Sequence, residues 1–156
     1  MAGPENGQPV ILLHGGGQTR HSWSKALSEL AAAGYKVISP DLRGHGESQW
    51  CPEGRYTLDD YMVDLGLIMG TLVSSPILVG ASLGGVVSLV GLGEQQLPPA
   101  RALVLVDVVP RMESAGVKEI IDFMSANSGG FVSIDAAAHA VGQYSPHRPR
   151  RSSRVG

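Results

Sequence analysis

Residues 76–92 read Pro76-Ile-Leu-Val-Gly80-Ala-Ser82-Leu-Gly84-Gly-Val-Val-Ser-Leu-Val-Gly-Leu92. An apolar run passes here into a helix-forming run through Ser82, which has a glycine two positions before it and another two positions after it. Small residues at those places allow a strand and a helix to approach closely around a sharp turn, which lifts the serine hydroxyl out of the sheet. The pattern predicts either a nucleophile elbow with Ser82 at its tip or a plain junction whose serine caps the helix.

The composition favours a single glycine-rich α/β domain. The 156 residues are 43% hydrophobic and 17% charged, and they include 21 glycines. This balance is typical of a globular α/β protein and unlike a disordered or coiled-coil one. Residues 145–156 hold four arginines and no acidic residue, so the rest of the chain is acidic overall and gives no reason to expect a nucleic-acid partner.

Cysteine content and hydropathy bear on the compartment. Cys51 is the single cysteine, so no intramolecular disulfide can form and nothing indicates an oxidising compartment. The first residues lack the basic and apolar regions of a signal peptide, and no apolar run approaches the roughly 18 residues of a transmembrane helix. We therefore expect a cytoplasmic protein with no membrane partner.

Four apolar runs predict strands that alternate with helices. The strands are expected at Val10–Leu13, Tyr35–Ser39, Ile77–Val79 and Ala102–Asp107, and the helices at 23–31, 57–72 and 83–92. Ser22 is placed to cap the first helix and Gly34 to end it, while Thr57 with Asp60 forms a capping box for the second. Strands that alternate with helices predict a parallel sheet, whose carboxyl-end loops share one edge.

The loops at this edge carry the residues of interest. They are His14–Gly17, Asp41–Ser48, Ser82 and Asp107. Acyl transfer needs a nucleophile, a base, a group that orients the base, and N–H donors for the oxyanion. Ser82 supplies a nucleophile, and the side-chain-free loop after the first strand can bring a second N–H beside that of Leu83.

After Pro110 the pattern becomes helical. Two helices are predicted, Lys118–Ala126 and Ile134–Tyr144, and together they form a candidate lid. Residues 145–156 contain two prolines and almost no apolar residue, which predicts a disordered basic tail. The expected domains are therefore a core over residues 1–111, the start of a helical cap over 112–144, and this tail.

Several motifs together resemble the α/β-hydrolase superfamily, closest to its cap-bearing branch of esterases, carbon–carbon hydrolases, haloperoxidase-like enzymes and epoxide hydrolases. They are His14-Gly-Gly-Gly-Gln18, Asp41-Leu-Arg-Gly-His-Gly-Glu-Ser48, Gly80-Ala-Ser-Leu-Gly-Gly85 and Val104-Leu-Val-Asp107. The resemblance implies that Ser82 is the nucleophile and that the N–H groups of Gly16 and Leu83 form the oxyanion hole. It implies cleavage of an ester-type or C–C bond of a small molecule, with no cofactor and no metal. Members that cleave epoxides carry aspartate at the elbow, so Ser82 argues against that chemistry.

The departures from the family pattern are equally informative. The family's strand order is 1-2-4-3-5-6-7-8, and this chain matches strands three to six alone, which implies a partial α/β-hydrolase fold, truncated at both ends. The usual triad acid after strand seven and the base histidine after strand eight have no counterpart. Asp107 stands where some members carry the acid, after strand six, although bracing the loop is the alternative role. Two open sheet edges would allow self-association.

None of the five histidines is an evident base. His14, His21 and His45 are predicted to be structural, and neither His139 nor His147 has a spacing that places it at Ser82. Cys51 has no histidine or cation placed to lower its thiol pKa, so it is a poor nucleophile candidate. Trp23 is expected to pack in the core, and Gln18 to line the mouth of a pocket.

Two alternatives remain to be weighed. A dinucleotide-binding domain would also begin with a strand and a glycine loop, but Gly15-Gly-Gly-Gln-Thr-Arg20 lacks the third glycine of that motif, and no P-loop lysine occurs. The second alternative is functional: a catalytically inactive fragment of a serine hydrolase, without the triad histidine. The sequence leaves this second alternative open.

Overall fold

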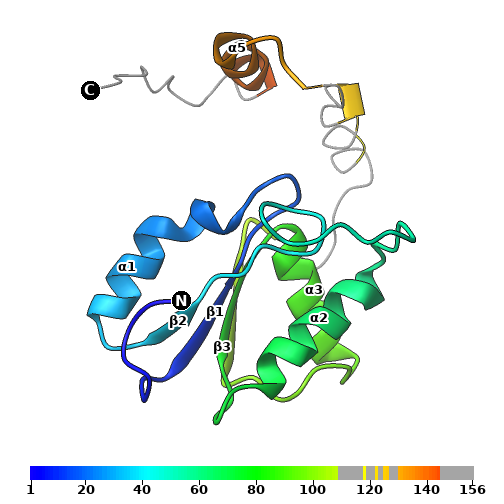
Figure 1. Ribbon diagram of the computed structural model, residues 1–156. Helices are drawn as coiled ribbons and strands as arrows, with labels where there is room; N and C mark the ends of the chain where they lie inside the picture. Colours follow the sequence, from blue (N-terminus) through cyan, green and yellow to red (C-terminus); the bar gives the residue numbers. More distant parts are fainter. Residues whose placement is uncertain (109–117, 119–121, 123–124, 127–129, 145–156) are drawn as a thin grey trace. The chain divides into compact units, whose positions relative to one another are not determined.

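The computed structural model describes residues 1–108, 118, 122, 125–126 and 130–144 (Figure 1). The chain divides into two compact units, Met1–Pro110 and Arg111–Gly156. In the second unit, helix α5 (Ile134–Tyr144) covers the same residues as the helix predicted there. The predicted helix over residues 118–126 lies mostly outside the described residues and the predicted tail lies wholly outside them. The proposed domain boundaries and the lid stay predictions.

The first unit is built on a four-stranded parallel sheet. Its strands are β1 (Pro9–Leu13), β2 (Lys36–Ile38), β3 (Ile77–Ala81) and β4 (Ala102–Val106), in the spatial order β2-β1-β3-β4. In family numbering this is the order 4-3-5-6, as the resemblance implies. The predicted α/β class and the partial sheet are therefore confirmed.

Helices cover the two faces of the sheet (Figure 1). Helix α1 (Ser24–Ala32) lies on one face, and α2 (Leu58–Gly70) and α3 (Leu83–Gly93) lie on the other. Because side chains alternate along a strand, β1 sends Val10 and Leu12 into the cluster under α1. It sends Ile11 and Leu13 into the larger cluster under α2 and α3. This central strand is buried on both faces, as a continuous apolar run in a parallel sheet should be.

The start of α1 differs from the prediction. A 3-10 turn, η1 (Arg20–Trp23), precedes the helix, so Trp23 rather than Ser22 occupies the N-cap position, and no side chain caps the helix. The physical reason lies in Arg20, whose N–H is held by the Asp41 carboxylate at 2.6 Å and fixes the turn before the helix begins. The end of α1 follows the prediction, because Gly34 adopts a φ of 90°.

The next two helices begin as predicted. Thr57 caps α2, accepting from the Asp60 N–H while the Asp60 carboxylate accepts from the Thr57 N–H, which completes a capping box. The helix ends at Gly70, two residues before the predicted end, where Thr71 turns back to the Ile68 carbonyl. Helix α3 starts directly after Ser82 and so places the serine at the junction with β3.

The two edges of the sheet differ. Strand β2 is short, and Ala2 covers part of its outer edge in an antiparallel bridge with two hydrogen bonds to Val37, of 3.0 and 2.8 Å. No described strand pairs with the outer edge of β4, where the side chains of Val104 and Val106 are 45% and 39% exposed. The expectation of two open edges therefore needs correction: only β4 presents a fully open one among the described residues.

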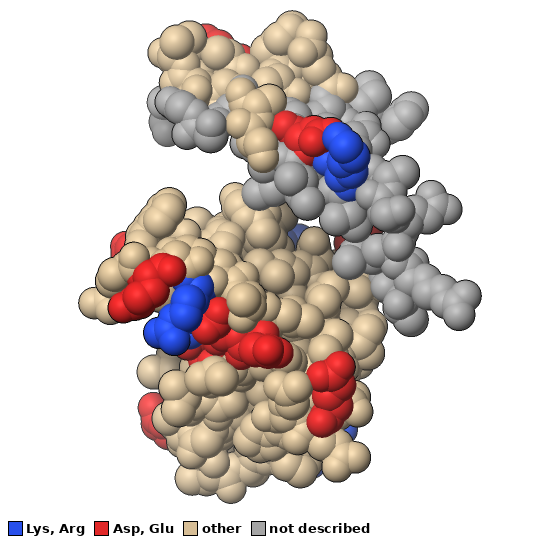
Figure 2. Space-filling view, turned by 90° about the vertical axis from the view of Figure 1, so that its right-hand side faces the viewer, with Lys and Arg blue, Asp and Glu red and all other residues tan. Residues whose placement is uncertain are grey.

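The surface of the first unit is sparsely charged on the face that Figure 2 displays. One basic group there is flanked by acidic side chains, and a further acidic group stands apart from it on the right of this face. Within the described part of the chain, no helix has the length and apolarity needed to cross a membrane.

Candidate active site

Ser82 sits in a sharp turn between β3 and α3. Its backbone has φ 43° and ψ −114°, a conformation that L-residues with a side chain rarely adopt. Its N–H donates to the Val106 carbonyl (3.3 Å), and its own carbonyl accepts from Val86 (2.9 Å). The serine side chain makes no capping bond to the helix, so the plain helix-cap interpretation is wrong. The residue is exposed, and none of the described residues binds its hydroxyl.

Two glycines make this turn possible. A Cβ on Gly80 would lie 2.5 Å from the Gly84 carbonyl oxygen and from the Gly85 nitrogen. A Cβ on Gly84 would lie 2.5 Å from the Leu13 Cβ and 2.7 Å from its carbonyl oxygen. These are backbone approaches that no rotamer change can relieve. The prediction that side chains at these two positions would block the turn is confirmed.

The glycine loop after β1 lies against the elbow. The His14 carbonyl accepts from the Gly84 N–H (3.2 Å), and a Cβ on Gly15 would lie 3.2 Å from the Ser82 Cβ. Gln18 closes the loop, because its Oε1 accepts from the Gly15 N–H (3.2 Å) while its own N–H donates to the Gly15 carbonyl (3.1 Å). Gln18 therefore shapes this loop, and its expected place at a pocket mouth stays a prediction.

The backbone N–H groups of Gly16 and Leu83, near Ser82, have no acceptor among the described residues. Gly16 is exposed, and a Cβ placed on it would meet nothing within 4 Å. Leu83 opens helix α3, where the first N–H groups have no intrahelical acceptor. Both groups can therefore donate to an anionic or carbonyl oxygen brought to the site.

His14 is fully buried beneath this loop and holds it to the neighbouring one. Its Nε2 accepts from the Leu42 N–H (2.9 Å), so its Nδ1 carries the proton and donates to the Gly15 carbonyl (2.8 Å). Burial lowers the pKa of His14 and the nearby His45 adds to this, while the Gly15 carbonyl and the Asp41 charge oppose it. Both ring nitrogens are committed, which agrees with the predicted structural role.

His45 links the same two loops from the outer side. Its Nε2 accepts from the Gly17 N–H (3.1 Å), and its Nδ1 donates to the Arg43 carbonyl (3.0 Å). The two imidazole rings lie with their centroids 5.1 Å apart. His45 is therefore also engaged through both nitrogens, and neither histidine points a free nitrogen at Ser82.

Asp41 is the ionic centre of the loop that follows β2. Its carboxylate accepts from the Arg20 N–H (2.6 Å), from the Arg20 guanidinium (2.7 Å) and from the Glu47 N–H (3.1 Å). Burial raises the pKa of Asp41, but these hydrogen bonds and the Arg20 charge outweigh burial and hold the pKa below its usual value. Arg20 also pairs with the exposed Glu47 at 2.6 Å. The sequence identified this loop but gave no sign of the Arg20 link.

Asp107 follows β4 directly and stands next to the elbow in the sheet. Ala81 pairs with Val106, and the Ser82 N–H donates to the Val106 carbonyl, so Ser82 and Asp107 leave neighbouring strands side by side. Asp107 has a φ of 55° and is exposed. Within the described residues its carboxylate makes no hydrogen bond or ion pair.

The remaining candidates named from the sequence are Trp23, Cys51, His139 and His147. Trp23 packs under α1 as predicted, although its buried Nε1 has no hydrogen-bond partner among the described residues. The Cys51 thiol donates to the Glu53 carboxylate (3.2 Å). His139 lies in α5 of the second unit, and His147 falls outside the described residues. The described residues contain no cluster of ligands suited to a metal ion.

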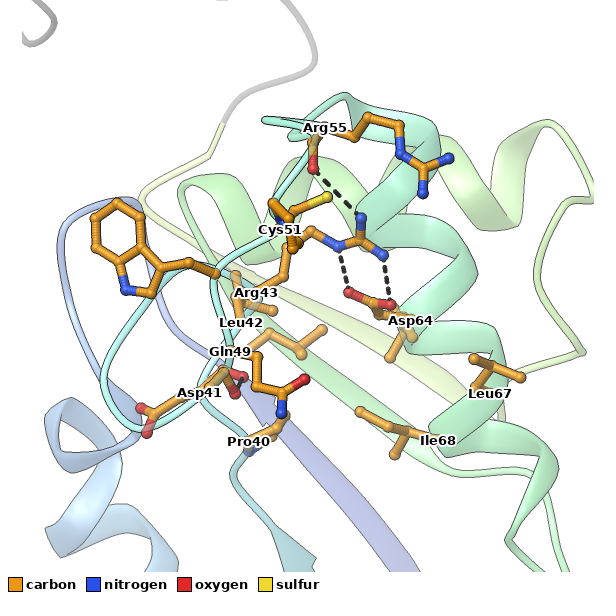
Figure 3. A pocket seen from close by; sticks show the side chains of 15 residues that line it. Pro40, Asp41, Leu42, Arg43, Gln49, Cys51, Arg55, Asp64, Leu67 and Ile68 are labelled. Carbon is orange, nitrogen blue, oxygen red and sulfur yellow. Dashed lines mark hydrogen bonds and ion pairs between the residues drawn. The ribbon is translucent and has the colours of Figure 1, made fainter.

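A cavity of about 620 Å³ lies between the 40–55 loop and α2, and Ser82 does not line it (Figure 3). Arg43 spans it to reach Asp64 through two charge-assisted hydrogen bonds, both of 2.6 Å. This ion pair raises the pKa of Arg43. It ties the loop to α2, and no sequence pattern indicated it, because the partners are 21 residues apart.

The fold and the elbow define a class, and the comparisons agree with it. The profile of the "Alpha/beta hydrolase family" matches residues 10–154, so this chain belongs to that family. The chain is 31% identical over 141 residues to a probable protein phosphatase methylesterase 1 of Caenorhabditis elegans, covering 86% of the chain and 39% of that protein. It is 36% identical over 102 residues to an esterase of Mycobacterium tuberculosis, covering 65% of the chain and 33% of that protein.

A solved structure of E-2-(acetamidomethylene)succinate hydrolase superposes with a TM-score of 0.80 at 27% identity, covering 96% of this chain and 54% of that one. The chain therefore spans about half the length of this structure. The chain spans a smaller share of the length of its curated relatives. The share is 39% and 33% for the two relatives named above, 28% for a putative non-heme chloroperoxidase of Synechocystis and 40% for a 3-hydroxybutyrate-oligomer hydrolase of Cupriavidus necator.

Proposed function

We propose that this chain is the nucleophile-bearing part of a serine hydrolase that cleaves ester-type bonds of a small molecule through an acyl-enzyme at Ser82. The observation that supports it most is the strained, exposed turn at Ser82 with two uncommitted N–H groups around it. Strained backbone at an exposed serine persists only where the surrounding structure imposes it, which is typical of functional sites.

In the proposed reaction, the Ser82 hydroxyl oxygen attacks the substrate carbonyl, and the hydroxyl proton passes to a base. The negative charge that develops on the carbonyl oxygen is stabilised by the N–H groups of Gly16 and Leu83. Collapse of this intermediate expels the alcohol and leaves an ester on Ser82, which water then hydrolyses. The steps use backbone and side-chain groups alone and call for no cofactor or metal.

Ester cleavage is favoured over C–C cleavage by the names of the relatives. The methylesterase and the esterase are both named for ester hydrolysis, and the first covers 86% of this chain. We extend that class, and not a particular substrate, to this chain. Asp107 is proposed as the triad acid on the strength of its place beside Ser82 at the ends of adjacent strands.

The second candidate is a catalytically inactive chain. One observation favours it: both nitrogens of His14 and of His45 are engaged with backbone groups, so neither ring can take the Ser82 proton as the site stands. An active hydrolase must then draw its base from beyond these two loops, as the family does with a histidine that follows strand eight.

A fluorophosphonate probe distinguishes the two candidates. Attack by a competent serine forms an oxygen–phosphorus bond and releases fluoride, and peptide mass mapping locates the adduct. We expect an adduct on Ser82 and turnover of p-nitrophenyl acetate, both lost in Ser82→Ala. A folded chain that shows neither the adduct nor turnover would favour the inactive candidate and would leave the family membership untouched.

The partners proposed are a small-molecule substrate and a second copy of the chain, with no nucleic acid or membrane, in a cytoplasmic protein. Self-association is proposed through β4 alone, because its apolar residues Ala102–Val106 carry none of the charges or prolines that commonly protect an edge strand. Size-exclusion chromatography tests this: Val104→Lys should yield monomer from any dimer that the unaltered chain forms.

A further inference from the structure

The hydrogen bond from the Gly17 N–H to the His45 Nε2 (3.1 Å) crosses between two loops 28 residues apart in the chain. We propose that His45 is a positioning residue, which fixes the peptide between Gly16 and Gly17 so that the Gly16 N–H keeps its direction for the oxyanion. The proposal rests on the proposed function, because it concerns the Gly16 donor. His45 itself touches no reacting atom in it.

The peptide that carries the Gly16 N–H lies between two anchored peptides. On one side, the Gly15 N–H is held by the Gln18 Oε1 at 3.2 Å. On the other, the Gly17 N–H is held by His45. The middle peptide is also held through its own carbonyl, because the Gly15 oxygen accepts from the His14 Nδ1 (2.8 Å) and from the Gln18 N–H (3.1 Å). The His45 bond adds the restraint on the Gly17 side, so that the direction of the Gly16 N–H is fixed from both ends.

Packing cannot supply this restraint. Gly15, Gly16 and Gly17 follow one another without side chains, and glycine has the widest conformational freedom of any residue. A Cβ on Gly16 would meet nothing within 4 Å, and Gly17 already has a φ of 71°. Hydrogen bonds are therefore the means by which this loop can be held in one conformation.

The imidazole of His45 has the tautomer and the orientation needed to accept the Gly17 N–H. The Gly17 N–H can only donate, so the His45 Nε2 that accepts this bond carries no proton. The ring proton is therefore on Nδ1, which donates to the Arg43 carbonyl (3.0 Å). That second bond orients the ring. Glycines on either side of the histidine, Gly44 and Gly46, have φ values of 72° and 53°, so the short turn presents the ring toward the glycine loop.

The test uses the full 156-residue chain and three variants. His45→Gln keeps an acceptor at a similar reach, because the glutamine Oε1 can replace Nε2, whereas His45→Leu removes it. His21→Leu is the matched control, since His21 is exposed in η1. Two readouts are measured: backbone 15N relaxation of Gly16 and Gly17, and the maximal rate and half-saturating concentration of fluorophosphonate labelling at Ser82.

We expect His45→Leu to reduce the maximal labelling rate about tenfold with an unchanged half-saturating concentration, because a donor displaced from its direction acts on the transition state. His45→Gln should stay within about threefold of the unaltered chain, and His21→Leu should match it. Order parameters of Gly16 and Gly17 should fall below about 0.6 in His45→Leu and stay near about 0.85 in the other two variants. Equal labelling rates and equal order parameters in both His45 variants would overturn the proposal.

Two outcomes need a further measurement: an unaltered chain that takes no label, and a His45→Leu variant that does not fold. If the unaltered chain takes no label, the proposed nucleophile fails, and the order parameters alone decide the role of His45. If His45→Leu does not fold, a scalar coupling between the Gly17 amide nitrogen and the His45 Nε2 is sought in the unaltered chain. Detection of that coupling, with retention of loop order in His45→Gln, supports the proposal, and its absence in the folded chain contradicts it.

Discussion

The loops that follow β1 and β2 contrast with the residues that follow β3 and β4. Residues 14–20 and 41–48, here called the anchored loops, are joined by the backbone N–H bonds that His14 and His45 accept and by the ionic contacts of Asp41. Ser82 and Asp107, here called the strand-end pair, both have positive φ values, and no described residue binds either side chain. One half of the same sheet edge is held by many contacts, and the other half is strained and unpartnered.

This difference separates two requirements of acyl transfer. Donors for an oxyanion must be held in place before the reaction, which the anchored loops do through contacts within the chain. A nucleophile needs an exposed hydroxyl and a base. The strand-end pair offers the hydroxyl, and both nitrogens of His14 and of His45 are engaged with backbone groups. The anchored loops thus hold the Gly16 donor proposed for the oxyanion, and the strand-end pair carries the proposed nucleophile.

The largest effect is expected at Gly84, which joins the two regions. Gly84→Ala places a Cβ 2.5 Å from the Leu13 Cβ and within 3 Å of the Leu13 backbone. Because backbone atoms cannot yield as a side-chain end can, we expect unfolding to become easier by more than about 3 kcal/mol. Gly93→Ala in the same helix, where a Cβ meets nothing within 4 Å, is the control and should leave stability unchanged or slightly raised. Similar urea midpoints for both variants would mean that the close approach at Gly84 is not required.

The next effect concerns the ionic centre of the anchored loops. The Asp41 side chain is 2% exposed and holds Arg20, whereas the Glu47 side chain is 79% exposed and holds the same arginine. We expect Asp41→Asn to lower the melting temperature by about 5 to 10 °C, because a buried charge partner is lost. Glu47→Gln should lower it by less than about 2 °C. Equal shifts in a calorimetric scan would show that burial does not distinguish these two ion pairs.

A smaller effect is expected from relief of strain in the strand-end pair. Ser82→Gly removes the Cβ that disfavours a positive φ, whereas Ser82→Ala retains it. We expect the glycine variant to be more stable than the alanine variant by about 1 kcal/mol in chemical unfolding. An alanine variant as stable as the glycine variant would indicate that the turn at Ser82 carries no strain.

The smallest effect is a pH dependence that originates at His14. Burial lowers the pKa of His14 in the folded chain below its ordinary value near 6.5. The nearby His45 adds to this effect, whereas the Gly15 carbonyl and the Asp41 charge oppose it. The unfolded chain therefore binds the proton first, so this contribution is complete above about pH 6.5 and is lost as the pH falls below it. His14→Gln should flatten the decline in unfolding free energy between pH 7 and 5, and His21→Gln should not.

The sequence was sufficient for the elements that depend on neighbours along the chain. Val10–Leu13, the capping box at Thr57 and the glycines around Ser82 act over a few residues, and each was predicted with its physical reason. The spatial order of the strands depends on which runs pair, and the apolar runs alone do not encode it. That order was available through the resemblance.

The contacts that shape the site could not be predicted, because their partners lie far apart in the chain. Gly17 and His45 are separated by 28 residues, and Arg43 and Asp64 by 21. Each bond requires a loop conformation that the assembled sheet determines. The predicted start of α1 was wrong for the same kind of reason. Ser22 is a good local cap, but the chain forms a 3-10 turn there, and the first residue of that turn, Arg20, is bound by the distant Asp41.

The central claim is that Ser82 is a nucleophile, and covalent labelling tests it most directly. The chain is treated with a fluorophosphonate at neutral pH, digested, and the adduct is mapped by mass, with Ser82→Ala treated in parallel. We expect one adduct, on Ser82, and none in the variant. An unlabelled Ser82 in a folded chain, or a label that persists in Ser82→Ala, would contradict the claim.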